Sequence, residues 1–373
     1  MLTSHLGIRL ILWLGESVPL PAPYEVMRAV DRVEVTSDAQ NGDGFQISFL
    51  LSKNQPSDYS LLQGGLLDPP TRVVIAVLLG VMPQVLIDGI ITHHQHAPSA
   101  EPGQSKLTVS GKDLSVMLDL EEKIDKHENQ PDFAVATKLI TAYKKYGLLP
   151  EVTLTTGVPL IVDLVPFQSH ETDLQYIQRM ARRNGFVFYI EPKTFLLNNA
   201  YWGPPKRSGV RQPALRLGPG PSANLKSIDF SLDALAPIGT EGKFVPPIGN
   251  TALPIPPLPS LRTPPLARRP VPALRTTITS DTANQDAGKA ANTALASGMN
   301  APEPVVGTGE IDTIRYGNVL RARKLVGVAG TGTSYDGDYY VRRVSHSISV
   351  GEYKQTFELG REGTGALKPR VTP

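Results

Sequence analysis

The sequence predicts a β-rich α+β protein in which two barrel-like groups of strands flank a helical middle section. Three observations support this fold class: runs of alternating apolar and polar residues near both ends, apolar residues at helical spacing between them, and abundant turn formers. The 373 residues include 33 Gly and 34 Pro, while aromatic residues make up only 6%. Alternation with period two is typical of strands that bury one face, and Gly and Pro favour the turns between them.

The first strand group covers about residues 1–120. Its main expected strands are 30–36, 45–50, 73–79, 84–91 and 106–111. Asn41-Gly42-Asp43-Gly44 favours a tight turn between the first two of them. The apolar run 6–14 contains Arg9 and is shorter than the ~20 residues that a membrane-spanning helix needs. We therefore expect a strand there, buried on both faces or packed against a neighbouring subunit, and we expect no membrane span in the chain.

The middle section changes to helical spacing. Apolar residues of the segment 131–143 recur every three to four residues, and Pro131 suits a first helical position. A second helix is expected from Ser169, as its N-cap, to Asn184, followed by a strand at 186–190.

A proline-rich tract follows the helical section. Eleven of the 34 prolines lie between Ala236 and Ala273. Prolines this dense remove backbone donors, so we expect neither a helix nor a central strand, but an extended, polyproline-like loop or an arm lying across a neighbour. Recognition by an SH3-type partner is the alternative. An alanine-rich stretch at 282–297 is expected to form a short helix before the final strands.

The bulk charge and the cysteine count exclude several classes of function. The formal net charge is only +2, which does not favour a nucleic acid as the main partner. The absence of cysteine excludes disulfides and thiolate metal sites. We therefore expect no cofactor and no nucleic-acid specificity.

Candidate metal and phosphate sites are few. His94 and His96 share one face if residues 93–96 form a strand, which would suit a divalent metal, but no third ligand is evident and a polar loop after Ile91 is the alternative. Asp336-Gly337-Asp338 resembles part of a calcium loop but is expected to be a turn. The glycine-rich segment 327–332 lacks the Gly-Lys-Ser/Thr ending of a phosphate loop. We therefore predict no metal and no cofactor-binding residues.

Catalytic groups are also few. Asp119, Glu121 and Glu122 would suit a pair of carboxylates for glycoside hydrolysis, but they lie in a run of alternating charge typical of a solvated surface. The basic residues around 321–324 and 342–343 are expected to be solvated or to line a channel. His346 is expected to be a hydrogen-bonded strand histidine. The sequence therefore predicts no catalytic residues and no enzymatic activity.

Two segments resemble one known family. Residues 336–346 follow the pattern DG-x-Y-x-V-x-x-V-x-H, and residues 351–359 follow G-x-Y-x-x-x-F-x-L. Residues 173–191, DLQYIQRMARRNGFVFYIE, are similar to a helix–strand segment that recurs in the same proteins. Together they resemble the phage late control protein D family, the baseplate hub proteins of contractile tails and injection systems, which share the hub half of VgrG.

This resemblance implies a specific arrangement of domains. Two small antiparallel β-barrels are expected in one subunit, with a helical α/β unit inserted in the first and a Pro-rich extended insertion before the second. The expected divisions are 1–120 for the main part of the first barrel, 121–200 for the α/β unit, 201–235 for return strands, 236–274 for the Pro-rich segment, and 275–373 for the second barrel and C-terminal tail.

The resemblance also implies a function. Three subunits with two barrels each would form a trimeric symmetry adaptor between a sixfold inner tube and a threefold spike. The expected partners are two further copies of the chain, the inner tube protein, baseplate wedge components and a spike. Since the sequence ends at Pro373, we expect the spike to be a separate polypeptide. The protein would be assembled in the bacterial cytoplasm and would become part of the baseplate of a phage tail or injection particle.

Two alternatives from other classes stay open at this point. One is a peptidoglycan-degrading enzyme of the same particle, whose activity would depend on Glu121 or Glu122. The other is a monomeric carbohydrate-binding β-protein.

Overall fold

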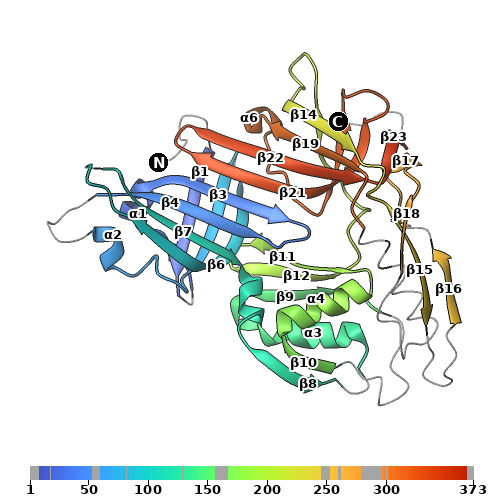
Figure 1. The fold of residues 1–373 in the computed structure, drawn as a ribbon. Helices are drawn as coiled ribbons and strands as arrows, with labels where there is room; N and C mark the ends of the chain where they lie inside the picture. The colour runs from blue at the N-terminus through green and yellow to red at the C-terminus, as the bar shows by residue number, and fades with distance from the viewer. Residues whose placement is uncertain are drawn as a thin grey trace.

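The computed structural model describes residues 8–16, 18–52, 59–80, 82–101, 103–127, 130–155, 167–244, 253–258, 262–278, 296, 298 and 301–367. These residues form a β-rich α+β fold with a large main sheet, a smaller α/β unit and a proline-rich arm (Figure 1). The predicted fold class is confirmed at this level. No helix in the described part of the chain is long and apolar enough to span a membrane.

The first β-lobe consists of six strands around one hydrophobic core. Its strands are β1 (Ile8–Gly15), β3 (Val30–Asp38), β4 (Gly44–Leu51), β5 (Arg72–Leu79), β6 (Met82–Ala97) and β7 (Ser105–Asp113). Alternate residues point into the core, so that β1 buries Ile8, Leu10 and Leu12 and exposes Arg9. The short elements β2 (Leu20–Pro21), α1 (Tyr24–Ala29) and α2 (Ser60–Gln63) lie beside these strands.

The N-terminal strand has apolar neighbours on both faces, as its sequence predicted. Ile11 and Trp13 lie on the face of β1 that points away from the lobe core, and they pack with Phe195 and Leu196 of the α/β unit. The rings of Trp13 and Phe195 are stacked with centroids 4.6 Å apart. This second apolar face explains why the run lacks the simple alternation of a half-exposed strand.

The second β-lobe has its own hydrophobic core. It contains β13 (Gln212–Arg216), β14 (Leu225–Leu232), β19 (Val305–Ile311), β20 (Leu325–Ala329), β21 (Gly337–Ser349), β22 (Glu352–Arg361) and the short helix α6 (Thr313–Tyr316). Thus β13 and β14, from the segment expected to supply return strands, pair with β20 and β19. The apolar residues predicted to alternate along β21 and β22, such as Val341, Val344 and Phe357, are buried in this core.

One seam joins the two lobes. β21 pairs with β22 on one side and with β3 on the other, in register from Arg343 opposite Asp38 to Ser349 opposite Arg32. The main sheet therefore runs from β14 through β21 and β3 to β2 as one open path of strands within the described residues. In Figure 1 the blue strands of the first lobe lie directly beside the red strands of the second.

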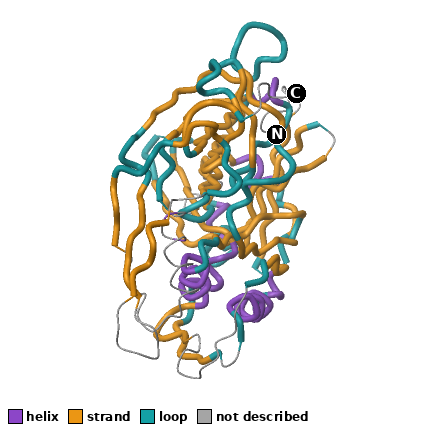
Figure 2. The backbone as a smooth tube through the Cα atoms, turned by 90° about the vertical axis from the view of Figure 1, so that its right-hand side faces the viewer, coloured by secondary structure: helices purple, strands orange, loops and turns teal. Residues whose placement is uncertain are grey.

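The α/β unit lies between β7 and β13 in the chain. Its elements are η2 (Leu114–Leu118), β8 (Glu122–Lys126), α3 (Asp132–Ala142), η3 (Lys144–Tyr146), β9 (Leu148–Val152), β10 (Phe167–Thr172), α4 (Asp173–Arg183), β11 (Val187–Thr194) and β12 (Leu197–Gly203). The helices α3 and α4 cover the small sheet β11-β12-β9 and share a core with it (Figures 1 and 2). The side chain of Trp202 in β12 is fully buried there.

Both expected helices are present, but the second begins later than predicted. Ser169 lies in strand β10 and is not the N-cap of α4. The N-cap is Thr172, which forms a capping box with Gln175. Ser169 pairs with Ile124 of β8, and because of this tertiary strand pairing the segment before Thr172 forms a strand and not the first turn of the helix.

The proline-rich tract contains strands, which corrects the prediction of an extended loop. β15 (Ile238–Phe244) lies between β16 (Leu253–Leu258) and β18 (Arg275–Ile278) in a three-stranded sheet. The central strand β15 carries no proline, whereas β16, at the edge, carries Pro254, Pro256 and Pro257. Edge strands tolerate proline because one side of the strand needs no hydrogen bonds. The predicted helix at 282–297 lies outside the described residues except for Ala296.

The arm is fastened to the second lobe at its base. The short strand β17 (Ala267–Pro270) pairs with β23 (Gly363–Ala366) near the C-terminal end. Leu266 packs with Leu325 and Tyr340 in a small apolar cluster. The segment around Leu266 is thus bound to the lobe, while β15, β16 and β18 extend to one side of it (Figure 1).

Candidate functional site: buried polar junctions between the parts

The histidines proposed as metal ligands lie in strand β6, which continues to Ala97. The alternative of a polar loop after Ile91 was therefore wrong. His94 Nδ1 lies 3.2 Å from Asp68 Oδ1, and the His96 ring lies edge-on to the ring of Tyr59. Among the described residues no group of three or more His, Asp or Glu side chains is arranged to hold a metal ion.

The acidic residues proposed for glycoside hydrolysis do not face one another across a cleft. Glu121 and Glu122 are exposed at the start of β8, and Glu122 is opposite Thr172 in the pairing of β8 with β10. Asp119 instead accepts a hydrogen bond of 2.6 Å from the Thr172 hydroxyl. This arrangement serves the start of helix α4 and shows no pair of carboxylates around a substrate-sized space.

The turn expected at Asp336-Gly337-Asp338 lies just before that motif, at residues 333–335, and Gly337 and Asp338 are the first residues of β21. The backbone N–H and the hydroxyl of Thr331 donate to Asp336 Oδ1, at 2.8 and 2.9 Å. Asp338 forms a bidentate ion pair with Arg211, with both N–O distances 2.7 Å. The Asp336 carboxylate therefore closes the loop before β21, and the Asp338 carboxylate, within β21, is paired with Arg211.

The candidate functional site consists instead of polar groups that are buried at three junctions between parts of the fold. The first junction joins the α/β unit to the first lobe. Arg72 of β5 and Asp88 of β6 form a bidentate pair with distances of 2.8 and 2.7 Å, and both side chains are buried. Asp88 also accepts from Asn198 of β12 at 2.8 Å, and Arg72 donates to the carbonyl of Tyr146 at 2.8 Å. The buried Asp88 carboxylate thus accepts hydrogen bonds from the side chains of Arg72 and Asn198, as a buried charge requires.

The second junction brings all three major parts together around Arg323. Arg323 precedes β20, has a left-handed backbone with φ 64°, and pairs through its guanidinium with Asp43 in the turn between β3 and β4. Its NH1 lies 3.0 Å from Asp43 Oδ2, and its NH2 also donates to the carbonyl of Asp38. The guanidinium lies 4.5 Å from the ring centre of Tyr189, which belongs to the α/β unit.

A neighbouring arginine makes a further contact between the lobes. Arg321 NH1 donates to the carbonyl of Val85 in β6 at 2.6 Å. Close to it, His346 is buried in β21, and its Nδ1 lies 2.9 Å from the Tyr353 hydroxyl. Burial, together with the charge of Arg321, lowers the pKa of His346 to about 3, so this ring stays neutral. The prediction of a hydrogen-bonded strand histidine is confirmed.

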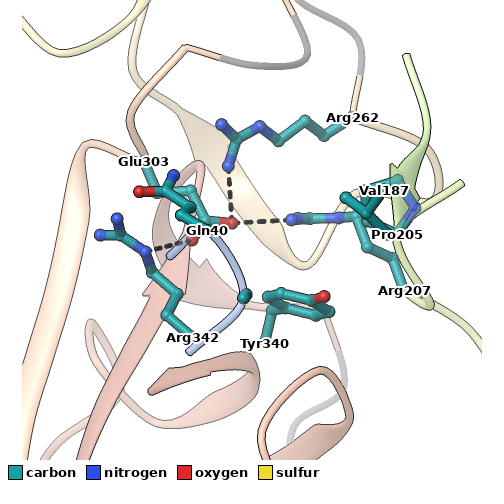
Figure 3. A pocket seen from close by; sticks show the side chains of 9 residues that line it. Gln40, Val187, Pro205, Arg207, Arg262, Glu303, Tyr340 and Arg342 are labelled. Carbon is teal, nitrogen blue, oxygen red and sulfur yellow. Dashed lines mark hydrogen bonds and ion pairs between the residues drawn. The ribbon is translucent and has the colours of Figure 1, made fainter. Parts of the chain in front are cut away.

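The third junction surrounds Glu303 at the base of the proline-rich arm. Figure 3 shows one carboxylate approached by arginines from three segments: Arg207 at 2.8 Å, Arg262 at 2.7 Å and Arg342 at 3.9 Å. They line part of a cavity of about 110 Å³. Two further acids, Glu362 on Arg207 and Glu358 on Arg342, balance the charge. The cluster therefore binds the arm to the second lobe and leaves no surplus of positive charge for an anion.

The role expected for the basic residues at 321–324 was wrong for Arg323, whereas Lys324 is partly exposed. They were predicted to be solvated or to line a channel, yet Arg323 is buried and Arg321 is half-buried. The partner of Arg323, Asp43, lies 280 residues earlier in the sequence. No local sequence pattern indicates that Arg323 pairs with Asp43, and the Asn-Gly-Asp-Gly segment that contains Asp43 indicated only a turn.

These junctions can hold separate parts of a chain in one orientation, and their described groups show no arrangement for acid–base or nucleophilic chemistry. Charge pairs and bidentate hydrogen bonds fix direction more sharply than apolar contacts do.

Comparison with solved structures places this fold among tail proteins. A tail protein from Neisseria meningitidis MC58 is similar with a TM-score of 0.63 and 15% identity, over 96% of this chain and 98% of that one. The 43 kDa tail protein of prophage MuSo2 from Shewanella oneidensis has a TM-score of 0.62 and 13% identity, over 95% and 98% of the two chains. The chain has the fold of these tail proteins.

A more distant similarity extends to bacterial secretion. An E. coli protein described as a component of the type VI secretion system, and as structurally similar to T4 bacteriophage tail proteins, has a TM-score of 0.55 and 12% identity. That match covers 92% of this chain and 77% of the E. coli chain. No protein-family model matches the sequence, and no curated protein matches it either.

Proposed function

We propose that the protein is the baseplate hub of a contractile phage tail or injection system, a structural component without enzymatic activity. The observation that carries the proposal is the pair of β-lobes, each with its own core, held in one subunit by buried polar junctions. The similarity in fold to tail proteins over nearly the whole chain supports it.

In this proposal each lobe acts as one barrel-like unit, and three copies place six such units around a channel. A sixfold tube would contact all six units, and a threefold spike would contact the three subunits. The proposed partners are the chain itself, the inner tube protein, a spike protein and baseplate wedge components. The proposal also keeps the domain divisions expected from the sequence, except that it assigns the strands at 201–235 to the second lobe, with the proline-rich segment as an appendage of that lobe.

The test is the assembly state together with the architecture of the assembly. We expect light scattering to give three times the chain mass for the purified chain alone, or a complex that contains three copies of the chain when it is mixed with the tube and spike proteins of the same particle. We expect electron microscopy of that species to show six β-lobes around a central channel. A chain that stays monomeric under all these conditions would refute the hub. Lysis of peptidoglycan that disappears in E121Q or E122Q, with D125N as an exposed control, would establish the enzyme instead.

A further inference from the structure

The Arg323 junction contains a second buried carboxyl group that the ion pair does not use. Asp113 ends strand β7, and its backbone N–H donates to the carbonyl of Asp43 at 3.1 Å. Asp113, Asp43 and Arg323 are 4%, 6% and 4% exposed. One guanidinium therefore serves a water-excluded site that holds two carboxyl groups.

The two carboxyl groups have different partners. Asp43 takes both amino groups of Arg323 and also the backbone N–H of Asp38 at 3.0 Å. Asp113 accepts from the backbone N–H of Ser115 at 3.0 Å and from the Ser115 hydroxyl, both uncharged donors. Asp43 thus satisfies the charge of Arg323, and an ionised Asp113 would add an uncompensated negative charge.

The groups that face this site from the surrounding elements are few. Asp43 comes from the turn before β4 and Arg323 from the segment before β20, while the phenols of Tyr189 in β11 and Tyr340 in β21 lie near the guanidinium. The cation whose charge acts on Asp113 is Arg323, which Asp43 already binds. A proton on Asp113 is therefore the simplest way to neutralise the cluster.

We propose that Asp113, Asp43 and Arg323 form a proton-dependent lock between the two β-lobes. With a proton on Asp113 the cluster is neutral and the junction is closed. Loss of that proton places a second negative charge beside Asp43 and favours opening of the contact between the turn at 38–43 and the segment before β20. The lock lies within one chain and does not depend on the proposed trimer.

The direction of the pH effect follows from the pKa of Asp113. Burial, and then the charge of Asp43, raise that pKa from 3.8 to about 7. A raised carboxyl pKa stabilises the closed state fully below pH ~4, and this stabilisation is lost as the pH rises toward 7. If the open state exposes Asp113, the opening equilibrium should increase about tenfold per pH unit between pH 5 and pH 7 and level off above pH 7.

Hydrogen–deuterium exchange of the intact chain at pH 5, 6, 7 and 8 tests the lock. The informative amides are those of Ala39, which donates to Arg342, and of Arg323, which donates to Val341. After correction for intrinsic exchange rates, we expect peptides with these amides to lose protection by roughly 50- to 100-fold from pH 5 to pH 8. Peptides from the core of the α/β unit serve as the internal reference and should change far less.

Two variants separate the lock from a general effect of pH. D113N keeps the shape of the side chain without the titration, so the protection at the junction should no longer depend on pH. D43N removes the neighbouring charge, so the midpoint of the dependence should move to lower pH. D229N, which changes an exposed carboxylate in β14, should behave like the unmodified chain.

Specific outcomes would overturn the lock. Equal protection of the junction at pH 5 and pH 8 in the unmodified chain would do so, as would a pH dependence that persists in D113N. If D113N fails to fold, judged by circular dichroism, D43N decides: an unchanged midpoint would show that the second carboxylate plays no part.

Discussion

Arg72 and Asp88 illustrate how single residues hold the parts of this molecule together. Both are buried, and their bidentate pair is completed by Asn198 and by the carbonyl of Tyr146. Removing one member of a buried pair leaves the other charge without compensation, which is more damaging than removing both charges.

We expect R72M to lower the free energy of unfolding by about 3–5 kcal/mol, because it leaves the Asp88 carboxylate buried beside apolar groups. The double variant R72M/D88N should lose clearly less, since the amide oxygen still accepts from Asn198 without a buried charge. Urea denaturation followed by tryptophan fluorescence measures both values. A loss below about 1 kcal/mol in R72M would mean that water or rearrangement rescues Asp88.

At this scale the sequence was a limited guide. It predicted the alternation that buries Val341 and Val344, and the hydrogen-bonded strand histidine His346, since these depend on neighbours within one strand or hairpin. It did not predict that Arg323 would be buried, because the decisive partner, Asp43, is distant in the chain. Long-range polar pairs have no periodic signature and cannot be found from one sequence.

At the scale of single elements, the limits of helix α4 depend both on its local sequence and on the tertiary pairing of the strand before it. Its capping box, acidic first residue Asp173 and basic final turn were all visible in the sequence. The prediction nevertheless placed the N-cap at Ser169, because the pairing of β10 with β8, which holds Ser169 in a strand, depends on tertiary structure. The N-cap hydroxyl also donates to Asp119 and so connects the helix to the segment before β8.

We expect T172A to destabilise the protein by about 1–2 kcal/mol, since it removes the acceptor for the Gln175 N–H and the donor to Asp119. T172S keeps both groups and should stay within about 0.5 kcal/mol of the unmodified chain. Thermal denaturation followed by circular dichroism compares the three proteins. Equal stability of T172A and T172S would show that the hydrogen bonds of the N-cap hydroxyl do not contribute measurably to the stability of the protein.

The proline-rich arm shows a different limit of prediction at this scale. The density of proline led to the prediction that the tract 236–273 forms neither a helix nor a central strand, and the central strand β15 shows that the second part was wrong. It did not exclude a strand for the proline-free segment 238–244, which pairs on both sides. The proline content of the whole tract does not indicate such a segment, whereas the position of each proline does.

At the scale of the whole molecule, the two lobes have distinct cores but share a continuous sheet, and Ile348 of β21 and Tyr353 of β22 pack into the core of the first lobe. β21 is bound to β22 and to β3 at the same time, so neither lobe can lose this strand alone. The existence of two β-regions around a helical unit was predictable from periodicity. The merging of the two regions along β3 and β21 was not, because strand pairing between distant segments depends on tertiary structure.

We therefore expect the lobes to unfold together in one transition. Differential scanning calorimetry should give a single peak whose calorimetric and van't Hoff enthalpies agree, with the same midpoint by fluorescence of Trp13 and Trp202. Measurement at low protein concentration and several concentrations separates this behaviour from dissociation of an oligomer. Two resolved peaks at all concentrations would show that the seam is too weak to couple the lobes.

The seam between β3 and β21 has a consequence for synthesis of the chain. Thr36 of β3 touches Ser345 of β21, 309 residues later. At ~5–20 residues per second a ribosome needs roughly 15–60 s to make the intervening chain. During that interval β3 emerges with an unsatisfied edge, which makes the nascent protein prone to pair with other strands. A holding chaperone that binds the emerging N-terminal half would raise the yield of native protein, and truncation before β21 would favour inclusion bodies.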